Sequence, residues 1–306
     1  MRVPRHRALL VVALGALAAC GKAKTSEDDG GAGGTGGTAG TGGRVLVTVS
    51  GRVAPHPLNA KLGAGEDFSM LQVAIVDPLA TLGDPTKPPL AAMPLDTAAT
   101  NCDVATGCAF SLIGVDITNQ TLGLVGTVDD RRAADARVWV KTGTGLGTKE
   151  FLTEVRRAPA PITDRRGFAV SRKLQVKLAA FVATSLGVAM TPEELEARGY
   201  LIGHVVGMLS EGTPDPPPVA GATVTSPGTT TLPYELLYPN ADFTMKLGAT
   251  GPDGIFLVVP KEAKSFVTSW NVVRPAGDTR EWETYLAGTN PGNAFVAILP
   301  ATEPTP

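Results

Sequence analysis

Short apolar runs between clusters of glycine, proline and aspartate constrain this chain more than any other feature of its sequence. In RVLVTVSGRV, residues 44–53, the residues Val45, Val47 and Val49 occupy every second position. Side chains of a β-strand alternate between its two faces, so this spacing predicts a strand with one apolar face. Many such runs between turn residues are typical of an all-β sandwich. Similar strand-like runs lie at residues 70–76, 109–117, 122–128 and 137–142.

Two short helices are expected between two groups of strands. Over residues 173–186 the apolar residues recur at helical spacing, and Ser171 is the expected N-cap. Thr191 and Glu194 then have the spacing of a capping box, with proline at the first helical position, and Gly199 suits the C-terminus. The chain is therefore predicted to be mainly β, with two β-domains joined by a short helical segment.

The second group of strands contains a family-like pattern. PVAGATV at 218–224 and TGPDGIF at 250–256 resemble the carboxypeptidase regulatory-like module. The resemblance covers about residues 200–275 and implies a transthyretin-like (prealbumin-like) β-sandwich. SGRV at 50–53 parallels IGHV at 202–205, which suggests a weaker copy, with another kind of sandwich as the alternative for the first domain. The expected domains are an N-terminal β-sandwich at 44–155, a linker with two short helices at 156–199 and the regulatory-like β-sandwich at 200–306.

The N-terminus has the layout of a secretory signal peptide. A basic start precedes an apolar run at residues 8–19, which is too short to span a bilayer, since a span needs ~20 residues. The end of the run, LAAC at 17–20, resembles the lipobox of bacterial lipoprotein precursors. The resemblance implies that the sulfur of Cys20 receives a diacylglyceryl group and that residues 1–19 are removed. A plain signal peptide cut near Ala19 is the alternative.

A tether is expected after the lipidated cysteine. Residues 30–43 are only glycine, alanine and threonine, a composition that cannot bury enough apolar surface to fold. Residues 20–43 are therefore predicted to form a flexible coil that reaches about 26 Å. An unselected low-complexity leader is the alternative. Gly21 and Lys22 follow Cys20 with no aspartate, and resemblance to known sorting rules then favours the outer membrane over the inner one.

The charge balance argues against nucleic acid as a partner. The leader holds three of the 27 lysines and arginines and none of the 29 acidic residues. The mature chain then has 24 basic residues against 29 acidic ones, a net charge of about −5. Nucleic-acid binding needs a basic surface, which this balance does not supply.

The two histidines of the mature chain are far apart in the sequence. His56 lies between two prolines and His204 lies in a predicted strand, and both are expected to be structural rather than ligands. No H-E-x-x-H, G-x-S-x-G or P-loop pattern accompanies them. The sequence therefore predicts no catalytic residue, no metal site and no cofactor.

Acidic pairs are the other groups that we considered for a metal. Glu66 and Asp67, like Asp129 and Asp130, are adjacent, but no calcium-loop spacing surrounds them. Asp253 has the same shortcoming. Solvated turns are the favoured interpretation of all these acids, with a calcium site as the alternative.

Aromatic residues near the C-terminus are weak candidates for ligand binding. Trp270, Trp282 and Tyr285 flank a polar segment rich in glycine and proline, where exposed rings would stack on sugars. Large aromatic side chains more often pack in a core. Core packing is the default expectation for these three residues and also for Tyr234 and Tyr238.

The remaining cysteines are expected to form a disulfide. The chain has three cysteines, and lipidation of Cys20 leaves Cys102 and Cys108 as a pair in an oxidising compartment. Their bond would pin the end of the proline-rich loop predicted at 77–101 against the strand that follows. A two-cysteine metal clip is the alternative.

Together these features predict a non-enzymatic, lipid-anchored protein of the cell envelope. Its expected role is structural, adhesive or accessory, through β-sandwich modules. A surface lipoprotein that binds carbohydrate or peptide is the alternative. The expected partners are membrane lipid, through the acyl anchor, and an envelope protein or glycan.

Overall fold

The computed structural model describes residues 43–62, 67–84, 86–98, 102–103, 106–208, 216–227 and 233–302. Arg44–Pro306 form one compact unit, distinct from Met1–Gly43. The expected signal peptide, Cys20 and nearly all of the expected tether lie outside the described residues. In the part of the chain that is described, no helix is long and apolar enough to cross a membrane.

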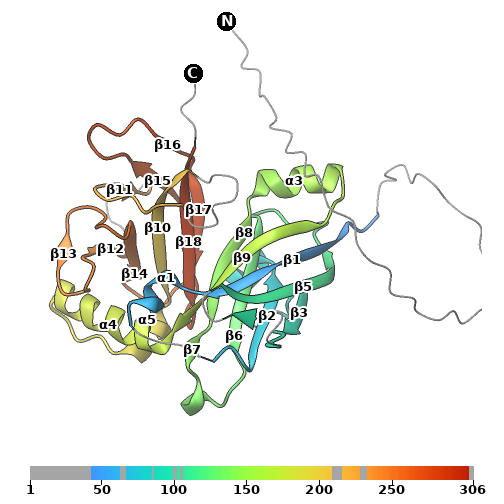
Figure 1. The fold of residues 1–306 in the computed structure, drawn as a ribbon, viewed down its shortest axis with the longest axis horizontal. Coiled ribbons are helices and arrows are strands. Elements are labelled where there is room, and N and C mark those ends of the chain that lie inside the picture. The colour runs from blue at the N-terminus through green and yellow to red at the C-terminus, as the bar shows by residue number, and fades with distance from the viewer. Residues whose placement is uncertain are drawn as a thin grey trace, which may run out of the picture. The chain divides into compact units, whose positions relative to one another are not determined.

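The largest sheet among the described residues has ten strands and draws on both halves of the sequence (Figure 1). The strands are β2 (Leu71–Val76), β3 (Ala91–Pro94), β6 (Leu124–Asp130), β8 (Thr142–Gly147), β10 (Tyr200–Met208), β12 (Tyr234–Pro239), β13 (Lys246–Leu247), β14 (Ile255–Pro260), β16 (Glu281–Trp282) and β18 (Ala294–Thr302). Their order is β13-β12-β14-β10-β18-β8-β6-β2-β3, and β16 pairs with β18. β18 runs parallel to both β10 and β8, and it joins the strands of the N-terminal half to those of the C-terminal half.

Two smaller sheets pack against this one. The five-stranded sheet has the order β4-β5-β1-β9-β7 and the three-stranded sheet the order β11-β15-β17. Their strands are β1 (Leu46–Pro55), β4 (Cys102–Asp103), β5 (Gly107–Asp116), β7 (Trp139–Val140), β9 (Ile162–Ser171), β11 (Thr223–Thr225), β15 (Phe266–Val273) and β17 (Tyr285–Thr289). In the five-stranded sheet, β1 pairs antiparallel with β5 and parallel with β9.

Of the five helices in the described residues, the two that the sequence predicts begin at their predicted capping residues. The five helices are α1 (Pro57–Ala60), α2 (Pro78–Gly83), α3 (Lys149–Arg157), α4 (Arg172–Leu186) and α5 (Pro192–Arg198), with a 3-10 turn at Ala134–Ala136. The side chain of Ser171 accepts a hydrogen bond from the N–H of Leu174 at 3.1 Å and caps α4. Thr191 and Glu194 form the predicted capping box at α5, and Gly199 follows its last turn. Both predicted helices are confirmed.

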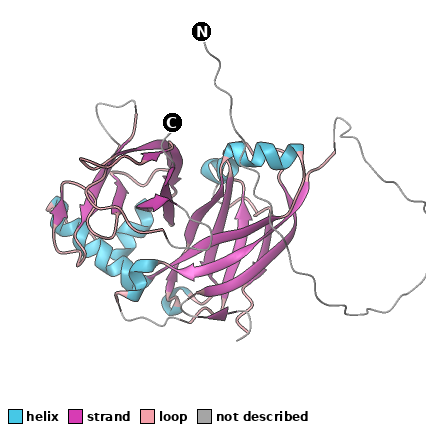
Figure 2. Ribbon diagram, turned by 45° about the horizontal axis from the view of Figure 1, so that its top comes forward, coloured by secondary structure: helices cyan, strands magenta, loops and turns pink. Residues whose placement is uncertain are grey.

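Three apolar cores separate the layers. The first lies between the five-stranded sheet and one face of β2 and β6. The second lies between α4, α5 and one face of β10, β14 and β18. The third lies between the opposite face of those strands and the three-stranded sheet. Figure 2 shows how far strands outnumber helices, and the predicted mainly β class is confirmed.

Two segments differ from the sequence prediction. The proline-rich stretch 77–101 was expected to be a loop, but it contains α2 and β3, and β3 pairs with β2. The expected linker 156–199 contains β9 besides its two helices, and β9 is an interior strand of the five-stranded sheet. The first half of β9 is polar, so its sequence lacks the apolar alternation of an obvious strand. The division into two sandwich domains is not confirmed and stays a prediction, since one sheet runs through residues of both.

Candidate functional site

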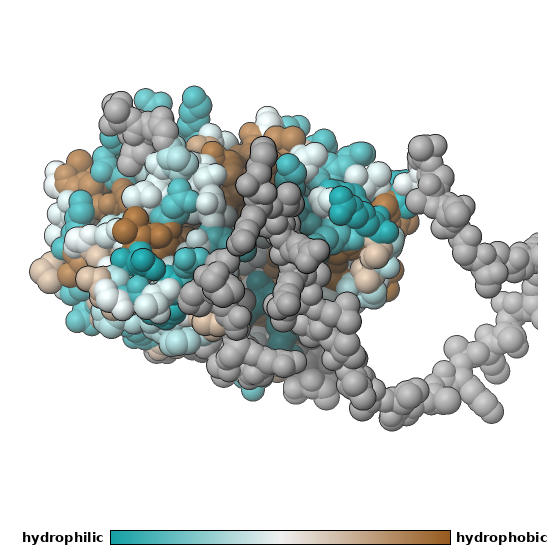
Figure 3. All heavy atoms as spheres, turned by 90° about the horizontal axis from the view of Figure 1, so that it is seen from above, coloured by the Kyte–Doolittle hydropathy of each residue, from teal (hydrophilic) through white to brown (hydrophobic). Residues whose placement is uncertain are grey.

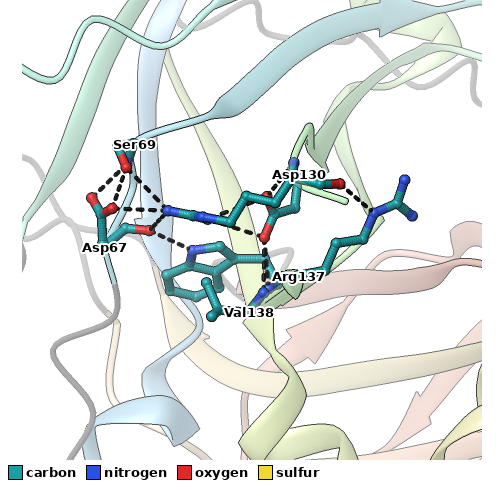
Figure 4. Close-up of polar contacts among 7 residues, drawn as sticks. Asp67, Ser69, Asp130, Arg137 and Val138 are labelled. Atoms are coloured by element: carbon teal, nitrogen blue, oxygen red, sulfur yellow. Dashed lines mark hydrogen bonds and ion pairs between the residues drawn. The ribbon is translucent and has the colours of Figure 1, made fainter. Parts of the chain in front are cut away.

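A polar cluster around the buried Asp130 joins β6 to the segment before β2 (Figure 4). The carboxylate of Asp130 is fully buried and accepts hydrogen bonds from the backbone N–H groups of Val138 and Trp139 at 2.9 and 3.2 Å. Arg132 forms ion pairs with both Asp130 and Asp67, at 3.1 and 2.8 Å. Burial raises the pKa of Asp130, but hydrogen bonds from three backbone N–H groups and Arg132 outweigh it and keep this pKa below its usual value.

This cluster is a structural clamp. Every acceptor that Asp130 offers is occupied by protein donors, and the indole N–H of Trp139 donates to the carbonyl of Asp67 at 2.9 Å. Asp130 therefore does not lie in a solvated turn, and that interpretation is wrong for it. No group of three or more potential metal ligands occurs among the described residues, and Glu66 lies outside them.

The two histidines lie in contact, although 148 positions separate them. His56 and His204 are buried, and their Nε2 atoms are 2.8 Å apart. The Nδ1 atom of His56 accepts from the N–H of Leu58 at 3.3 Å, which assigns the proton of His56 to Nε2. His56 therefore donates to His204, and both rings are neutral in this arrangement.

Burial controls the protonation of this pair. It lowers the pKa of His56 well below its usual value, and the neighbouring His204 lowers it further. Burial also lowers the pKa of His204 to about 4, although Asp253 raises it. Lys61 forms an ion pair with Asp253 at 2.5 Å. The sequence analysis did not predict this contact, because the two histidines are 148 positions apart and no local pattern joins them.

The aromatic candidates belong to the third core. Trp270 is fully buried and donates its indole N–H to the carbonyl of Ala287 at 3.2 Å, so it is closed to a ligand. Trp282 is half-buried and donates to the carbonyl of Val206 at 3.1 Å. Tyr285, Tyr234 and Tyr238 also pack in or against this core. Core packing, the default expectation for all five, describes where the structure places them.

Cys102 and Cys108 face each other across β4 and β5, with Cα atoms 3.9 Å apart and a disulfide between their sulfurs. This arrangement fits the predicted bond. Cys108 is fully buried and Cys102 is half-buried, so the pair forms part of the first core.

A groove of about 220 Å³ lies over the face of β2 and β6 that points away from the first core. Ala74 and Thr127 lie opposite each other on its floor. The end of β17 and the helix α2 line its sides. Typical pockets for drug-sized molecules hold about 300–1,000 Å³, so this groove suits a smaller ligand.

Small residues keep the floor of this groove open. Gly143 lies beside Thr127 and Phe295 across β6, β8 and β18. A Cβ atom at Gly143 would lie 2.9 Å from the ring of Phe295, so glycine makes room for that ring. Sequence reasoning did not find the groove, because its lining comes from segments scattered between residues 72 and 295.

Comparisons with known proteins give weak likenesses. No family model matches the chain. No curated protein matches it either. Among solved structures, the shaft pilin SpaA of Lactobacillus rhamnosus GG is similar at 7% identity and a TM-score of 0.22, over 86% of this chain and 100% of that one. A minor pilin of Streptococcus agalactiae is similar at 10% identity and a TM-score of 0.22, over 85% and 98%. With TM-scores this low the likeness carries no argument about function, and the mainly β fold is argued from the strands described above.

Proposed function

We propose that this chain is a non-enzymatic lipoprotein, anchored through Cys20 to the envelope of a bacterial cell, with the outer membrane as its site. Its β-structure then has a structural, adhesive or accessory role outside the cytoplasm. The observation that carries the proposal is the LAAC junction at 17–20 followed by a segment of glycine, alanine and threonine. The finer proposal that residues 200–306 are a carboxypeptidase regulatory-like module depends on the motifs at 218–224 and 250–256 alone.

The structure is compatible with attachment by a lipid. The compact unit begins at Arg44, where the expected tether ends. Figure 3 shows apolar atoms of the described residues in separate patches between hydrophilic ones on the face that it presents. Attachment by a lipid needs no apolar surface on the protein itself, since several acyl chains hold a protein stably at about 0.8 kcal/mol per buried methylene.

Metabolic labelling tests the anchor. The full chain, its Cys20→Ser variant and a Cys102→Ser control are expressed in a bacterium that processes lipoproteins, with a palmitate analogue in the medium. The parent and the Cys102→Ser control are expected to be labelled, and the Cys20→Ser variant is not. Equal labelling of the parent and the Cys20→Ser variant would falsify the proposal.

A second role, as a binding lipoprotein, is favoured by the groove over β2 and β6. The aromatic residues that were weak candidates for contacting sugars pack in or against the third core, which removes the main reason to propose a glycan ligand. The groove instead combines apolar and polar side chains in a space suited to a small molecule.

A further inference from the structure

The strand register orders the groove into a polar end and an apolar end. Gln72 pairs with Asp129 across β2 and β6, and the register of β6 with β8 extends to place Lys141 beside Asp129. Four residues further along the two strands, Val76 pairs with Val125. All five residues line the groove, so the strands under it are polar at one end and apolar at the other.

The polar end contains buried oxygens without partners. Thr289 is 3% exposed and lines the groove at the end of β17, and its Oγ1 atom has no hydrogen-bond partner among the described residues. The Oδ1 atom of Asn290, the next residue, is likewise buried and unpaired there. A buried polar group without a partner costs about 1–3 kcal/mol, so these two oxygens mark a place where a ligand donor is stabilising.

Two opposite charges lie at the same end. Asp129 and Lys141 are both half-buried and line the groove. Neither has an ion pair within 4.0 Å among the described residues. Because they do not pair with each other, the carboxylate of Asp129 is available to a cationic group of a ligand and the ammonium of Lys141 to an anionic group.

We propose that this groove binds a free apolar α-amino acid, with leucine as the reference ligand. The ammonium of the ligand pairs with Asp129 and donates to the oxygens of Thr289 and Asn290, and its carboxylate pairs with Lys141. Its side chain lies over the small floor residues toward Val76 and Val125. A volume of about 220 Å³ holds a molecule of this size. The inference deepens the binding role and does not depend on the anchor.

Calorimetric titration of leucine into the purified full chain tests this assignment. Leucine is expected to bind, whereas N-acetyl-leucine and leucine amide, which each lack one of the two charges, bind at least about tenfold more weakly. N-acetyl-leucine also stands for the carboxyl end of a peptide, and leucine amide for its amino end. Undiminished binding of either derivative would overturn the assignment to a free amino acid.

Variants of the groove separate binding from folding. Asp129→Asn and Lys141→Met are each expected to weaken leucine binding at least tenfold, and Thr289→Val severalfold. Lys264→Met, at an exposed residue outside the groove, is the matched control and leaves binding unchanged. Thermal unfolding of each variant verifies that it is folded. Absence of leucine binding to the parent, or equal affinity of the folded variants and the parent, would refute the inference.

The lipid anchor at Cys20 and the amino-acid site in the groove are tested independently of each other. Labelling at Cys20 depends on lipid attachment and is read from the attached label. Leucine titration depends on residues of the compact unit alone. A labelled protein that does not bind leucine refutes the ligand and keeps the anchor, and an unlabelled protein that binds leucine does the reverse.

Discussion

The two halves of the ten-stranded sheet differ in how they are covered. β10 and β14 are buried along nearly their whole length, because α4 and α5 cover one face and the three-stranded sheet covers the other. β6 alternates between buried and half-buried residues, since the five-stranded sheet covers one face and the groove opens on the other. One sheet therefore contains a closed half and an open half.

The sequences of these strands already carry the difference. GIFLVVP around β14 is a continuous apolar run, as expected for a strand covered on both faces. LVGTVDD in β6 alternates, and its second set of side chains is small or polar. The difference teaches that polar side chains and a groove occur where a sheet face lacks a covering layer, while the covered faces form the apolar cores.

The largest expected change in stability comes from a comparison of two phenylalanines. Phe256 on β14 is fully buried, whereas Phe295 on β18 is half-buried and lines the groove. Phe256→Ala is expected to lower the free energy of unfolding by about 3–5 kcal/mol, because it leaves a cavity in the third core. Phe295→Ala is expected to cost less than about 2 kcal/mol, since solvent already reaches its site. Urea unfolding measures both, and equal losses would contradict the division of the sheet.

Two glycines give the next comparison. A Cβ atom at Gly203 on β10 would lie 2.0 Å from the buried ring of Phe256, so Gly203→Ala is expected to cost about 3 kcal/mol. A Cβ atom at Gly143 would lie 2.9 Å from the half-buried ring of Phe295, which has room to shift, and Gly143→Ala is expected to cost under about 1 kcal/mol. Thermal melting of both variants checks the order. A larger loss from Gly143→Ala would reverse the argument.

The disulfide provides a reference for stability outside both halves of the ten-stranded sheet. Cys102 and Cys108 join β4 to β5 in the five-stranded sheet. A bond that closes a loop of seven residues stabilises a chain by about 2.4 kcal/mol through chain entropy, so the double Cys→Ser variant is expected to lose that amount. Alkylation of the unreduced, unfolded protein followed by mass measurement counts free thiols. No added label at these two positions supports the bond, and two labels would refute it.

Acid is expected to destabilise the fold through the buried pair His56 and His204, which lies at the closed half of the ten-stranded sheet. The folded-state pKa values of His56 and His204 lie below the ordinary value of 6.5, so the unfolded chain binds more protons below that pH. Above pH 6.5 the histidine pair does not lower the free energy of unfolding. Below pH 6.5 this free energy falls toward pH 4, by about 1.4 kcal/mol per pH unit for each proton that the unfolded chain binds in excess of the folded one. Urea unfolding between pH 7 and 4.5 measures the slope.

The matched variant for this experiment is His204→Gln. Its amide oxygen accepts the hydrogen bond from His56 and does not titrate. Groups that face the pair, including Asp253 and Lys61, stay in place, so the slope between pH 6.5 and 4.5 should become shallower. An unchanged slope would show that the pair does not control acid stability.

Strands with clean alternation and helices with caps were predictable from the sequence, and tertiary contacts were not. Val45, Val47 and Val49 predicted β1, and Ser171 predicted the start of α4, because those signals are local. β9 was missed because its polar first half is held as a strand by pairing with β1, more than a hundred positions away. The groove was missed for the same reason, since its charged residues come from separate strands.

The position of β18 has a consequence for biogenesis. Translation proceeds from the N-terminus, so β10 and β8 leave the ribosome long before β18, the strand that lies between them. Until β18 is made, each of these two strands has one open edge, and an open edge readily pairs with the wrong chain. Completion of the sheet therefore waits for the last described strand of the chain, wherever the chain folds.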